Sequence, residues 1–459
     1  MQFKCALGKL PQIFENASHS DKDSMASDNT DDYQATIFAN RLAKRYKLLR
    51  KWARKNGVTC YRLYDRDIPE VPLAVDVYEL LPAHIATRAA AAQFLAAQNE
   101  RISQNDSAVE KEIAARRYAT LYEYERTSAI LRKSQSEKVP HALSAEKLQH
   151  TGSAEKRAHS NSTEKRPAHA LHRENSAWIL LMANALAAML GIARSHVIVK
   201  TRKHAKGGSQ YADGAPPQTA RDVPIRQQRA ISGMVQESGL LFSVDLTSHI
   251  DTGLFFDMRL LRAIIRETAR GKRVLNLYCY TASFSVYAAA GGAAAIDSVD
   301  LSNTYLAWAQ ENMHANGFCD EKKYRFFRAD VKEFLARTCN AGTAQKNNEQ
   351  NTFRNAHVLA ARYDIIILDP PTFSNSKMAR TMLDINRDWA QLVNACVALL
   401  SENGVLYFST NSRRLKFDET LIAQPYGSPL AVEEITAQTM PRDFERTKAH
   451  RVWKIAVQQ

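Results

Sequence analysis

The half of the chain that follows Asp257 alternates regularly between short apolar runs and amphipathic helical segments. Strand-like runs such as Arg273–Leu277 and Tyr363–Asp369 are separated by segments with helical spacing of apolar residues, for example Thr304–Gly317. A strand, a helix and a further strand close as a right-handed crossover, which makes the strands parallel neighbours in one sheet. We therefore predict an α/β fold with a doubly wound, mostly parallel sheet. Ligands of such sheets bind beyond the carboxyl ends of the strands.

The first half of the chain is less regular and predicts a smaller α+β module. It opens with a basic amphipathic helix that runs from Ile37 to Gly57. The stretch from Ala86 to His172 is rich in Ala, Ser, Glu and Lys, and we interpret it as a solvated insertion that only the strand-like segment Ala115–Glu125 interrupts. The expected boundaries are a disordered tail at 1–32, an N-terminal module at 33–256 with polar insertions near 132–173 and 204–229, and the α/β domain at 257–459.

The charge balance favours a polyanionic partner. The chain has 62 Lys and Arg residues against 48 Asp and Glu residues, a formal net charge of +14. Nucleic acid is the first candidate for such a partner, because its phosphates attract Lys and Arg whatever the base sequence. The exposed face of the segment Arg41–Lys55 is the predicted phosphate-binding surface, and the N-terminal module is accordingly expected to bind RNA.

Cysteine usage and hydropathy exclude several other classes of protein. The six cysteines form no C-x-x-C pair, so neither a zinc site nor a disulfide framework is expected, and no metal is predicted. No run of about 18 apolar residues is present, and the first residues lack the apolar core of a signal peptide. We expect a cytoplasmic protein that is not embedded in a membrane.

Polar residues stand where three of the predicted strands end. The turn Asn276–Ser283 is built from small and polar residues, so backbone N–H groups and a helix N-terminus can face a cofactor there. Asp300 closes the next strand, where a carboxylate can accept hydrogen bonds from both hydroxyls of a ribose. Asp330 closes the third strand, within reach of an adenine amino group. An Asp at such a position is more often a helix N-cap, and it is the order of the three features that indicates a nucleoside site.

The segment Asp369-Pro370-Pro371-Thr372-Phe373-Ser374 follows a fourth, buried strand. Two consecutive prolines stop the sheet, remove two N–H donors and hold the chain extended, so that carbonyl oxygens point into the cleft as hydrogen-bond acceptors. Phe373 can stack on a nucleobase that has been turned out of its helix. Asp369, Pro370, Pro371 and Phe373 are therefore the predicted frame of a target base.

Five segments of the chain resemble the class I S-adenosylmethionine methyltransferases, and in particular the K half of the bacterial 23S rRNA guanine methyltransferase K/L family. They are Phe38–Glu79, His249–Arg259, Asn276–Ala293, Val299–Gly317 and Asp369–Lys377. The resemblance implies a Rossmann-like fold with a mostly parallel, twisted seven-stranded sheet and S-adenosyl-L-methionine as cofactor. It also implies 23S rRNA or a large-subunit assembly intermediate as partner, and N7-methylguanine in helix 74 as product.

The same resemblance implies roles for individual residues. Tyr280, Thr281 and Ser283 would line the methionine end of the cofactor, beside Asn276, while Asp300 would bind the ribose and Asp330 the adenine. Asp257 and Arg259 would support the carboxylate and amino groups of the methionine, and Asp369 would contact both cofactor and target base. One position departs from the family, because Ala282 stands where a glycine usually follows Tyr-Thr. If that glycine has a positive φ, alanine there costs about 1 kcal/mol.

Three alternatives remain open from the residues alone. The acceptors of Asp369–Thr372 suit guanine N2 as well as N7, since both atoms belong to the same base. Cytosine-C5 methylation needs a nucleophilic cysteine, and Asp369–Lys377 contains none, which leaves Cys279 as the nearest candidate in the sequence. The chain could also be a ribosome-assembly RNA-binding protein whose methyltransferase activity is secondary.

Overall fold

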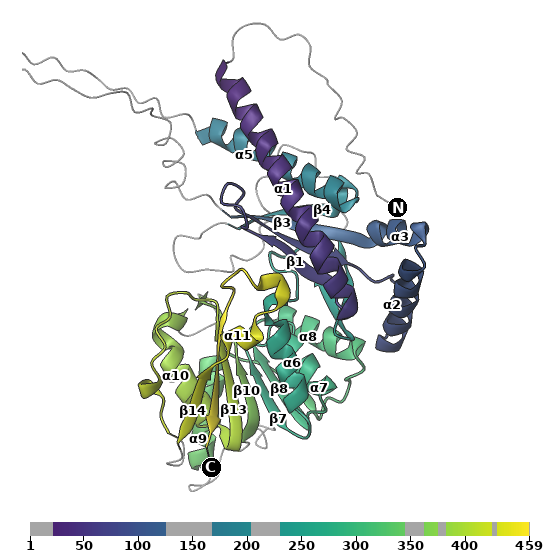
Figure 1. Ribbon diagram of the computed structural model, residues 1–459. Coiled ribbons are helices and arrows are strands. Elements are labelled where there is room, and N and C mark those ends of the chain that lie inside the picture. The colour runs from purple at the N-terminus through teal and green to yellow at the C-terminus, as the bar shows by residue number, and fades with distance from the viewer. Residues whose placement is uncertain are drawn as a thin grey trace, which may run out of the picture.

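The computed structural model describes residues 22–124, 168–202, 230–344, 362–374, 382–424 and 429–458. A smaller N-terminal part, coloured purple to teal in Figure 1, lies against one end of a larger part built around a sheet. The insertion predicted near 204–229 lies outside the described residues, as does most of the one near 132–173. None of the described helices is long and apolar enough to cross a membrane.

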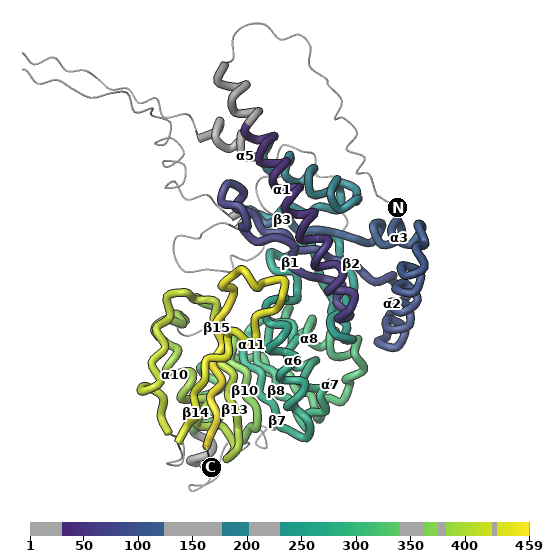
Figure 2. Tube along the Cα trace, in the orientation of Figure 1, coloured from purple at the N-terminus to yellow at the C-terminus, as the bar shows by residue number. Residues whose placement is uncertain are grey.

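The N-terminal part contains a four-stranded sheet in the order β1-β2-β3-β4, with helices α1 and α5 packed side by side against it (Figure 2). Phe38, Leu42 and Leu49 of α1 are fully buried, as the helical spacing of the basic segment predicts. The elements are α1 (Lys22–Lys55), β1 (Cys60–Asp65), β2 (Leu73–Glu79), α2 (Arg88–Ser103), α3 (Ser107–Arg116), β3 (Arg117–Tyr124), α5 (Ala168–Leu190), η1 (Arg194–His196) and β4 (Val197–Arg202).

Two expectations for this part are wrong. Helix α1 begins at Lys22, so residues 22–32 are helical and not a disordered tail; these residues are rich in Asp, which favours the positive N-terminal end of a helix dipole. The Ala-rich stretch is not all solvated insertion either, because α2 and α3 form within it. Their N-caps, Thr87 and Asp106, accept hydrogen bonds from Ala90 N (3.2 Å) and Ala108 N (2.9 Å). Alanine has the highest helix propensity, so a low-complexity composition here still forms helices.

The larger part contains the predicted sheet of seven strands, in the order β14-β15-β13-β10-β7-β8-β9. Strands β13, β10, β7, β8 and β9 are parallel, and β15 is antiparallel to both of its neighbours. This confirms the Rossmann-like α/β class. The strands are β7 (Arg273–Leu277), β8 (Ala295–Asp300), β9 (Tyr324–Arg328), β10 (Tyr363–Leu368), β13 (Leu400–Thr410), β14 (Leu430–Glu434) and β15 (Arg451–Val457).

Helices cover both faces of this sheet, and β10 shows how the sequence achieves it. Ile365 and Ile367 join one apolar cluster and Ile366 and Leu368 join the other, because side chains alternate across a strand. Helices α6 and α7 contribute to the first cluster and α9 and α10 to the second. The helical elements are η3 (Phe256–Met258), α6 (Arg259–Thr268), α7 (Ser283–Ala290), α8 (Asn303–Ala315), α9 (Val331–Ala344), α10 (Ile385–Val397), η4 (Glu419–Leu421), α11 (Thr436–Thr439) and η6 (Arg442–Phe444).

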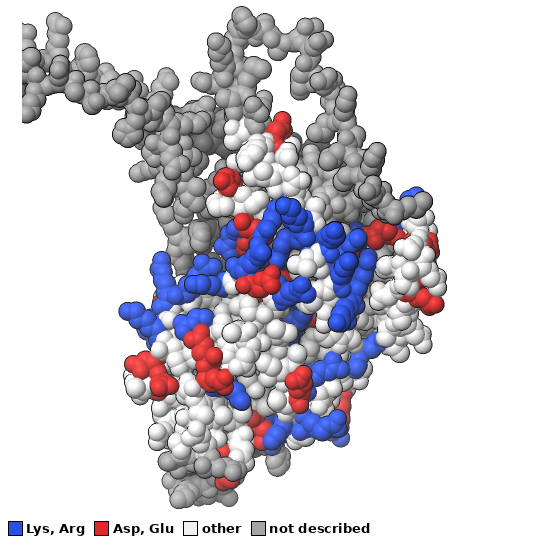
Figure 3. Space-filling model, viewed as in Figure 1, with Lys and Arg blue, Asp and Glu red and all other residues white. Residues whose placement is uncertain are grey.

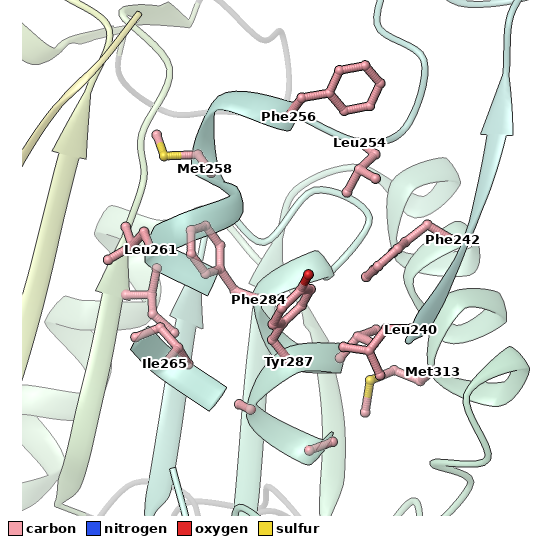
Figure 4. Packing of buried hydrophobic residues seen from close by; sticks show 14 of the residues in the cluster. Leu240, Phe242, Leu254, Phe256, Met258, Leu261, Ile265, Phe284, Tyr287 and Met313 are labelled. Carbon is pink, nitrogen blue, oxygen red and sulfur yellow. The ribbon is translucent and has the colours of Figure 1, made fainter. Parts of the chain in front are cut away.

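A hairpin of β5 (Ser232–Glu237) and β6 (Leu240–Asp245) packs on the larger part, although it precedes the expected domain boundary at Asp257 in the chain. Figure 4 shows Leu240 and Phe242 of this hairpin facing Tyr287 and Met313. Cys60, Tyr78 and Leu80 of the small sheet belong to the same buried cluster. The two parts therefore share this apolar cluster, although the small sheet also forms a cluster of its own with α1 and α5.

Candidate active site

The loop between β7 and α7 has an unusual backbone. Tyr278, Tyr280 and Ala282 have φ values of 56°, 52° and 59°, in the left-handed region that residues with a side chain seldom adopt. Thr281 Oγ1 donates to Gly253 O (2.6 Å), and Asn312 Nδ2 donates to Thr281 O (2.9 Å). These bonds tie the loop to its neighbours, so the strained backbone is held in a fixed shape.

Ala282 has the positive φ at which alanine was expected to cost about 1 kcal/mol relative to glycine. Its side chain is also fully buried. Glycine would adopt the same backbone without the contact between Cβ and the carbonyl oxygen. We expect Ala282→Gly to raise the free energy of unfolding by up to about 1 kcal/mol. Urea unfolding followed by tryptophan fluorescence measures this change. Ala289→Gly, in the last turn of α7 where φ is negative, is the matched control and should destabilise; a loss of stability in both variants would contradict the expectation.

Asp300 ends β8 and lies beside this loop. Its carboxylate accepts hydrogen bonds from Tyr280 N (3.0 Å) and Ser302 N (2.9 Å). Burial raises the pKa of the Asp300 carboxyl, and the two backbone donors oppose that rise. Ser302 is the N-cap of α8, so Asp300 is not itself the cap of that helix. The side chain is only partly buried and each of its oxygens keeps a lone pair, so it can accept further hydrogen bonds from a ligand.

The other predicted cofactor residues differ in how far they are available to a ligand. Asp330 Oδ1 accepts from Glu333 N (3.1 Å) at the start of α9, which is the helix-cap interaction considered from the sequence. Asn276 is buried and donates to Ser285 Oγ (2.9 Å) beneath the loop. Ser283 is the first residue of α7 and is partly exposed.

Arg259 does not support the expected role in cofactor binding. Its guanidinium is buried and donates to Glu237 Oε2 (2.6 Å), Asp443 Oδ1 (2.9 Å) and Cys60 O (2.9 Å). All three nitrogens of Arg259 are thus bonded to protein acceptors, and we correct its assignment to an ion pair in the core. The sequence could not show this, because the three acceptors lie on β5, on η6 and at the start of β1.

Asp257, two residues before Arg259 in the chain, belongs to a second group of hydrogen-bonded polar side chains. Asp257 Oδ2 lies 3.3 Å from His450 Nδ1, and the other ring nitrogen of His450 lies 3.0 Å from Thr439 Oγ1. Burial tends to raise the pKa of the Asp257 carboxyl, but the hydrogen bond with His450 and the nearby positive charges, among them Arg62 and Arg262, outweigh burial and hold that pKa below its ordinary value. Asp257 therefore carries a negative charge close to Asp369.

Asp369 follows β10 and is held by the adjacent strand. Its Oδ1 accepts from Ser409 Oγ (2.6 Å). Burial raises the pKa of Asp369 to about 6; the charge of Asp257 adds to the rise, while Ser409, His450 and Arg262 oppose it. At neutral pH this side chain is a carboxylate with one oxygen engaged by protein, which makes it an oriented hydrogen-bond acceptor.

The residues that follow Asp369 differ in how far they are exposed. Pro370 is buried, Pro371 and Thr372 are partly exposed, and Phe373 has 38% of its surface exposed. Phe373 and Ser374 form the short strand β11, which pairs with β12 (Leu383–Asp384). The predicted residues Asn375–Lys377 of the resembling segment lie outside the described residues. An exposed aromatic ring at the end of a central strand suits stacking on a planar ligand.

Three site residues escaped the sequence analysis: Ser409, Asn411 and His450. Thr372 Oγ1 donates to Asn411 Oδ1, so the end of β13 supports the end of β10. Ser409 and Asn411 carry the signal used for Asp300, a polar residue where a buried strand ends. His450 carries no local signal, because its partner Asp257 is on another element far away in sequence.

Cys279 is an ordinary buried thiol. Only 5% of its surface is exposed, and burial, with Asp300 adding to it, raises the pKa of the thiol well above its ordinary value. A thiol that stays protonated is a poor nucleophile. The cytosine-C5 alternative thereby loses the cysteine that the sequence offered for it.

Comparisons with known proteins identify the class to which the chain belongs. A family model described as S-adenosylmethionine-dependent methyltransferase matches residues 183–337. The methyltransferase SMU.776, solved in complex with SAH, aligns with a TM-score of 0.53 at 19% identity and covers 92% of this chain and 82% of its own. A SAM-dependent methyltransferase from Streptococcus mutans aligns with a TM-score of 0.52 at 19% identity and similar coverage, 92% and 81%. The chain is an S-adenosylmethionine-dependent methyltransferase.

Curated relatives identify the family to which the chain belongs within this class of methyltransferases. Ribosomal RNA large subunit methyltransferase K of Neisseria meningitidis is 34% identical over 92% of this chain and 87% of its own length. Ribosomal RNA large subunit methyltransferase K/L of Magnetococcus marinus is 35% identical over 92% of this chain, which spans 43% of that longer protein. The chain belongs to the family of ribosomal RNA large subunit methyltransferase K.

Proposed function

We propose that the protein transfers a methyl group from S-adenosyl-L-methionine to N7 of a guanine in helix 74 of 23S rRNA, in the cytoplasm, on the RNA or on a large-subunit assembly intermediate. The observation that carries the proposal is the oriented carboxylate of Asp369 beside Pro370 and Pro371, in a chain of the K family. The assignment of large-subunit ribosomal RNA as the substrate rests on the names of the relatives. The choice of N7 and of helix 74 rests on the resemblance of five segments to the K half of the K/L family.

The acceptors at the end of β10 suit guanine. The Watson–Crick edge of guanine presents N1–H and N2–H₂ donors, which match a carboxylate and neighbouring carbonyl oxygens. A guanine held by that edge keeps N7 free on its opposite edge. N7 has a lone pair in the ring plane and no proton to lose, so its methylation needs no general base. Asp369 then orients the base, and Phe373, exposed beside it, stacks on the ring.

The residues around Asp300 suit the cofactor. When bound, S-adenosylmethionine supplies a methyl group on a sulfonium, a good leaving group that needs no activation by the protein. The free lone pairs of Asp300 would accept hydrogen bonds from the two ribose hydroxyls, and Asp330 would accept one from the adenine amino group. Tyr280, Thr281 and Ser283 form the loop expected at the methionine end, where Asp257 would face the amino group. Positioning, rather than acid–base chemistry, is the main contribution of these residues.

The test uses 23S rRNA from a strain that lacks the protein. We expect it to lose the borohydride/aniline cleavage that N7-methylguanine gives at helix 74. The wild-type gene should restore cleavage, whereas Asp300→Ala should not, because the cofactor would lose two charge-assisted hydrogen bonds, about 3 kcal/mol or roughly a hundredfold in affinity. Cleavage that persists in the deletion strain would exclude the N7 assignment. Loss of a methyl group from guanine N2 instead would support the N2 alternative.

A further inference from the structure

Two loops of the methyltransferase domain present exposed cations at the carboxyl ends of its parallel strands. Arg413 and Arg414 follow β13, and Arg442 and Lys448 lie in the segment that precedes β15. All four side chains are exposed, and none forms an ion pair with a residue that the structure describes. Exposed arginine and lysine side chains without a carboxylate partner are free to bind an anion, and they need not break an ion pair to do so.

These loops adjoin the target-base site. Phe408 of β13 pairs with Leu368 of β10, so the chain leaves both strands at the same place. The bond from Thr372 to Asn411 joins the segment before Arg413 to the Asp-Pro-Pro-Thr segment. Arg413 and Arg414 therefore flank the position at which Asp369 and Phe373 would hold an extruded base.

The same loops also adjoin the basic helix of the N-terminal part. Arg451 Nη1 at the start of β15 donates to Leu415 O (3.1 Å), which brings the two loops together. Arg45 of α1 donates to Asp443 O (3.2 Å) and pairs with Glu445 (3.4 Å). The segment 442–448 thus bridges α1 and the loop that carries Arg413.

Figure 3 shows the result on the surface. Lys and Arg side chains gather in a band across the middle of the molecule, over α1 and between α1 and the edge of the large sheet. On α1 the exposed members include Lys44, Lys47 and Lys51. Acidic side chains interrupt the band (Figure 3). Glu445, which lies between Arg442 and Lys448 in the chain, is already paired with Arg45 and Arg446.

We propose that Arg413, Arg414, Arg442 and Lys448 bind backbone phosphates on either side of the target nucleotide, and that they continue the path of an RNA that also contacts α1. The proposal rests on the proposed function in that its partner is RNA. Such contacts carry no base information; they fix the register of the RNA so that one nucleotide stands over the Asp369 site. They also hold the flanking backbone when that nucleotide leaves its stack.

The test compares two double variants of the full chain. Arg413→Ala/Arg414→Ala removes two proposed phosphate contacts. Arg270→Ala/Lys322→Ala removes two cations just before β7 and β9, at the opposite ends of the strands. Binding of a helix 74 RNA fragment and of an unrelated structured RNA is measured by fluorescence anisotropy at several salt concentrations. The slope of log affinity against log salt should fall by about 1.5 for the first variant, with roughly tenfold weaker binding of both RNAs, and should not change for the second.

Two controls keep the outcome specific. Calorimetry with S-adenosylhomocysteine should give equal affinities for wild type and both variants, which excludes a folding defect. An unchanged salt slope in Arg413→Ala/Arg414→Ala, or an equal fall in the two variants, would overturn the proposal. The assay does not depend on which atom is methylated, so a reduced slope together with persistent N7-methylguanine in the deletion strain would retain the phosphate contacts and reject the assigned target.

Discussion

Glu237→Ala is expected to lower the free energy of unfolding by about 3–5 kcal/mol. The Glu237 side chain is fully buried and accepts hydrogen bonds from Arg259 Nε (2.6 Å), Arg262 Nε (3.0 Å) and Tyr287 Oη (2.9 Å). Burial opposes ionisation, but the charges of Arg262 and Arg259 outweigh it and lower the pKa of Glu237. Removing the carboxylate would leave two buried guanidinium groups without their shared counter-ion, which costs more than the lost bonds alone.

Urea unfolding at pH 7 measures the effect. The control is Glu434→Ala, which breaks the half-exposed pair between Glu434 and Arg451 (2.9 Å) and should cost no more than about 1 kcal/mol. Equal losses in the two variants would show that the buried network does not stabilise the fold. Because Arg259 also contacts Cys60 O and Asp443, we further expect Glu237→Ala to increase hydrogen exchange on both sides of the domain boundary.

Asp369→Asn is expected to stabilise the fold at neutral and alkaline pH while it lowers activity. The pKa of Asp369 is about 6 in the folded protein, against about 4 for an unfolded chain. The stability gained by protonating Asp369 is fully present below pH 4 and is lost as the pH rises through 6. Asparagine keeps the acceptor for Ser409 and avoids the buried charge, so it should add about 3 kcal/mol at pH 8 and little at pH 4.

The same substitution, Asp369→Asn, should lower the rate of methyl transfer. The carboxamide places N–H donors against the N–H donors of guanine, so one charge-assisted hydrogen bond is lost and methyl transfer falls about 10- to 100-fold. The wild-type rate should also decline below pH 6, as the carboxylate becomes protonated. Methyl transfer to a helix 74 fragment between pH 5 and 9, together with urea unfolding at pH 4 and 8, tests both expectations.

The matched control for Asp369 is Asp364→Asn, the same substitution near the other end of β10. Asp364 lies at the opposite end of β10 and accepts from Arg273 N (2.8 Å) and Ser401 Oγ (2.9 Å), so it should give neither the gain in stability nor the loss of activity. If Asp369→Asn gained no stability at pH 8, the buried charge would not carry the cost described here. Full activity of that variant would remove Asp369 from the site.

The sequence predicts the sheet well, because local pattern determines it. The central parallel strands carry short apolar runs, such as Ile365–Leu368 of β10 and Val405–Phe408 of β13, whereas β8 and β9 towards the edge are more polar. Strand β14 was not anticipated, since its residues are only partly buried or exposed and its sequence lacks a strong apolar run. Helices α2 and α3 were not predicted, because the Ala-rich composition was interpreted as a solvated insertion and the N-caps Thr87 and Asp106 were not considered.

Some residues of the candidate site could likewise be predicted from the sequence, and others could not. Asp300 and Asp369 could be located because each ends a buried strand, and strand ends are visible in sequence. Arg259 and His450 could not be interpreted, since their partners come from distant elements. The resemblance placed Arg259 at the cofactor, and only the three-dimensional contacts show that its charge is neutralised inside the core.

The ion pair around Asp443 makes the domain boundary a poor place to divide the protein. Asp443 accepts from Arg62 N (3.1 Å) in the small sheet and from Arg259 in the catalytic part, while the hairpin that carries Glu237 precedes Asp257 in the chain. A fragment cut at Asp257 would expose one side of the shared apolar cluster and would lack Glu237, which leaves Arg262 without its carboxylate partner and Arg259 with Asp443 alone. The two parts differ in sequence pattern but are joined by this ion pair and by a shared apolar cluster, and helix α1 is held through Arg45 to the segment that ends at His450.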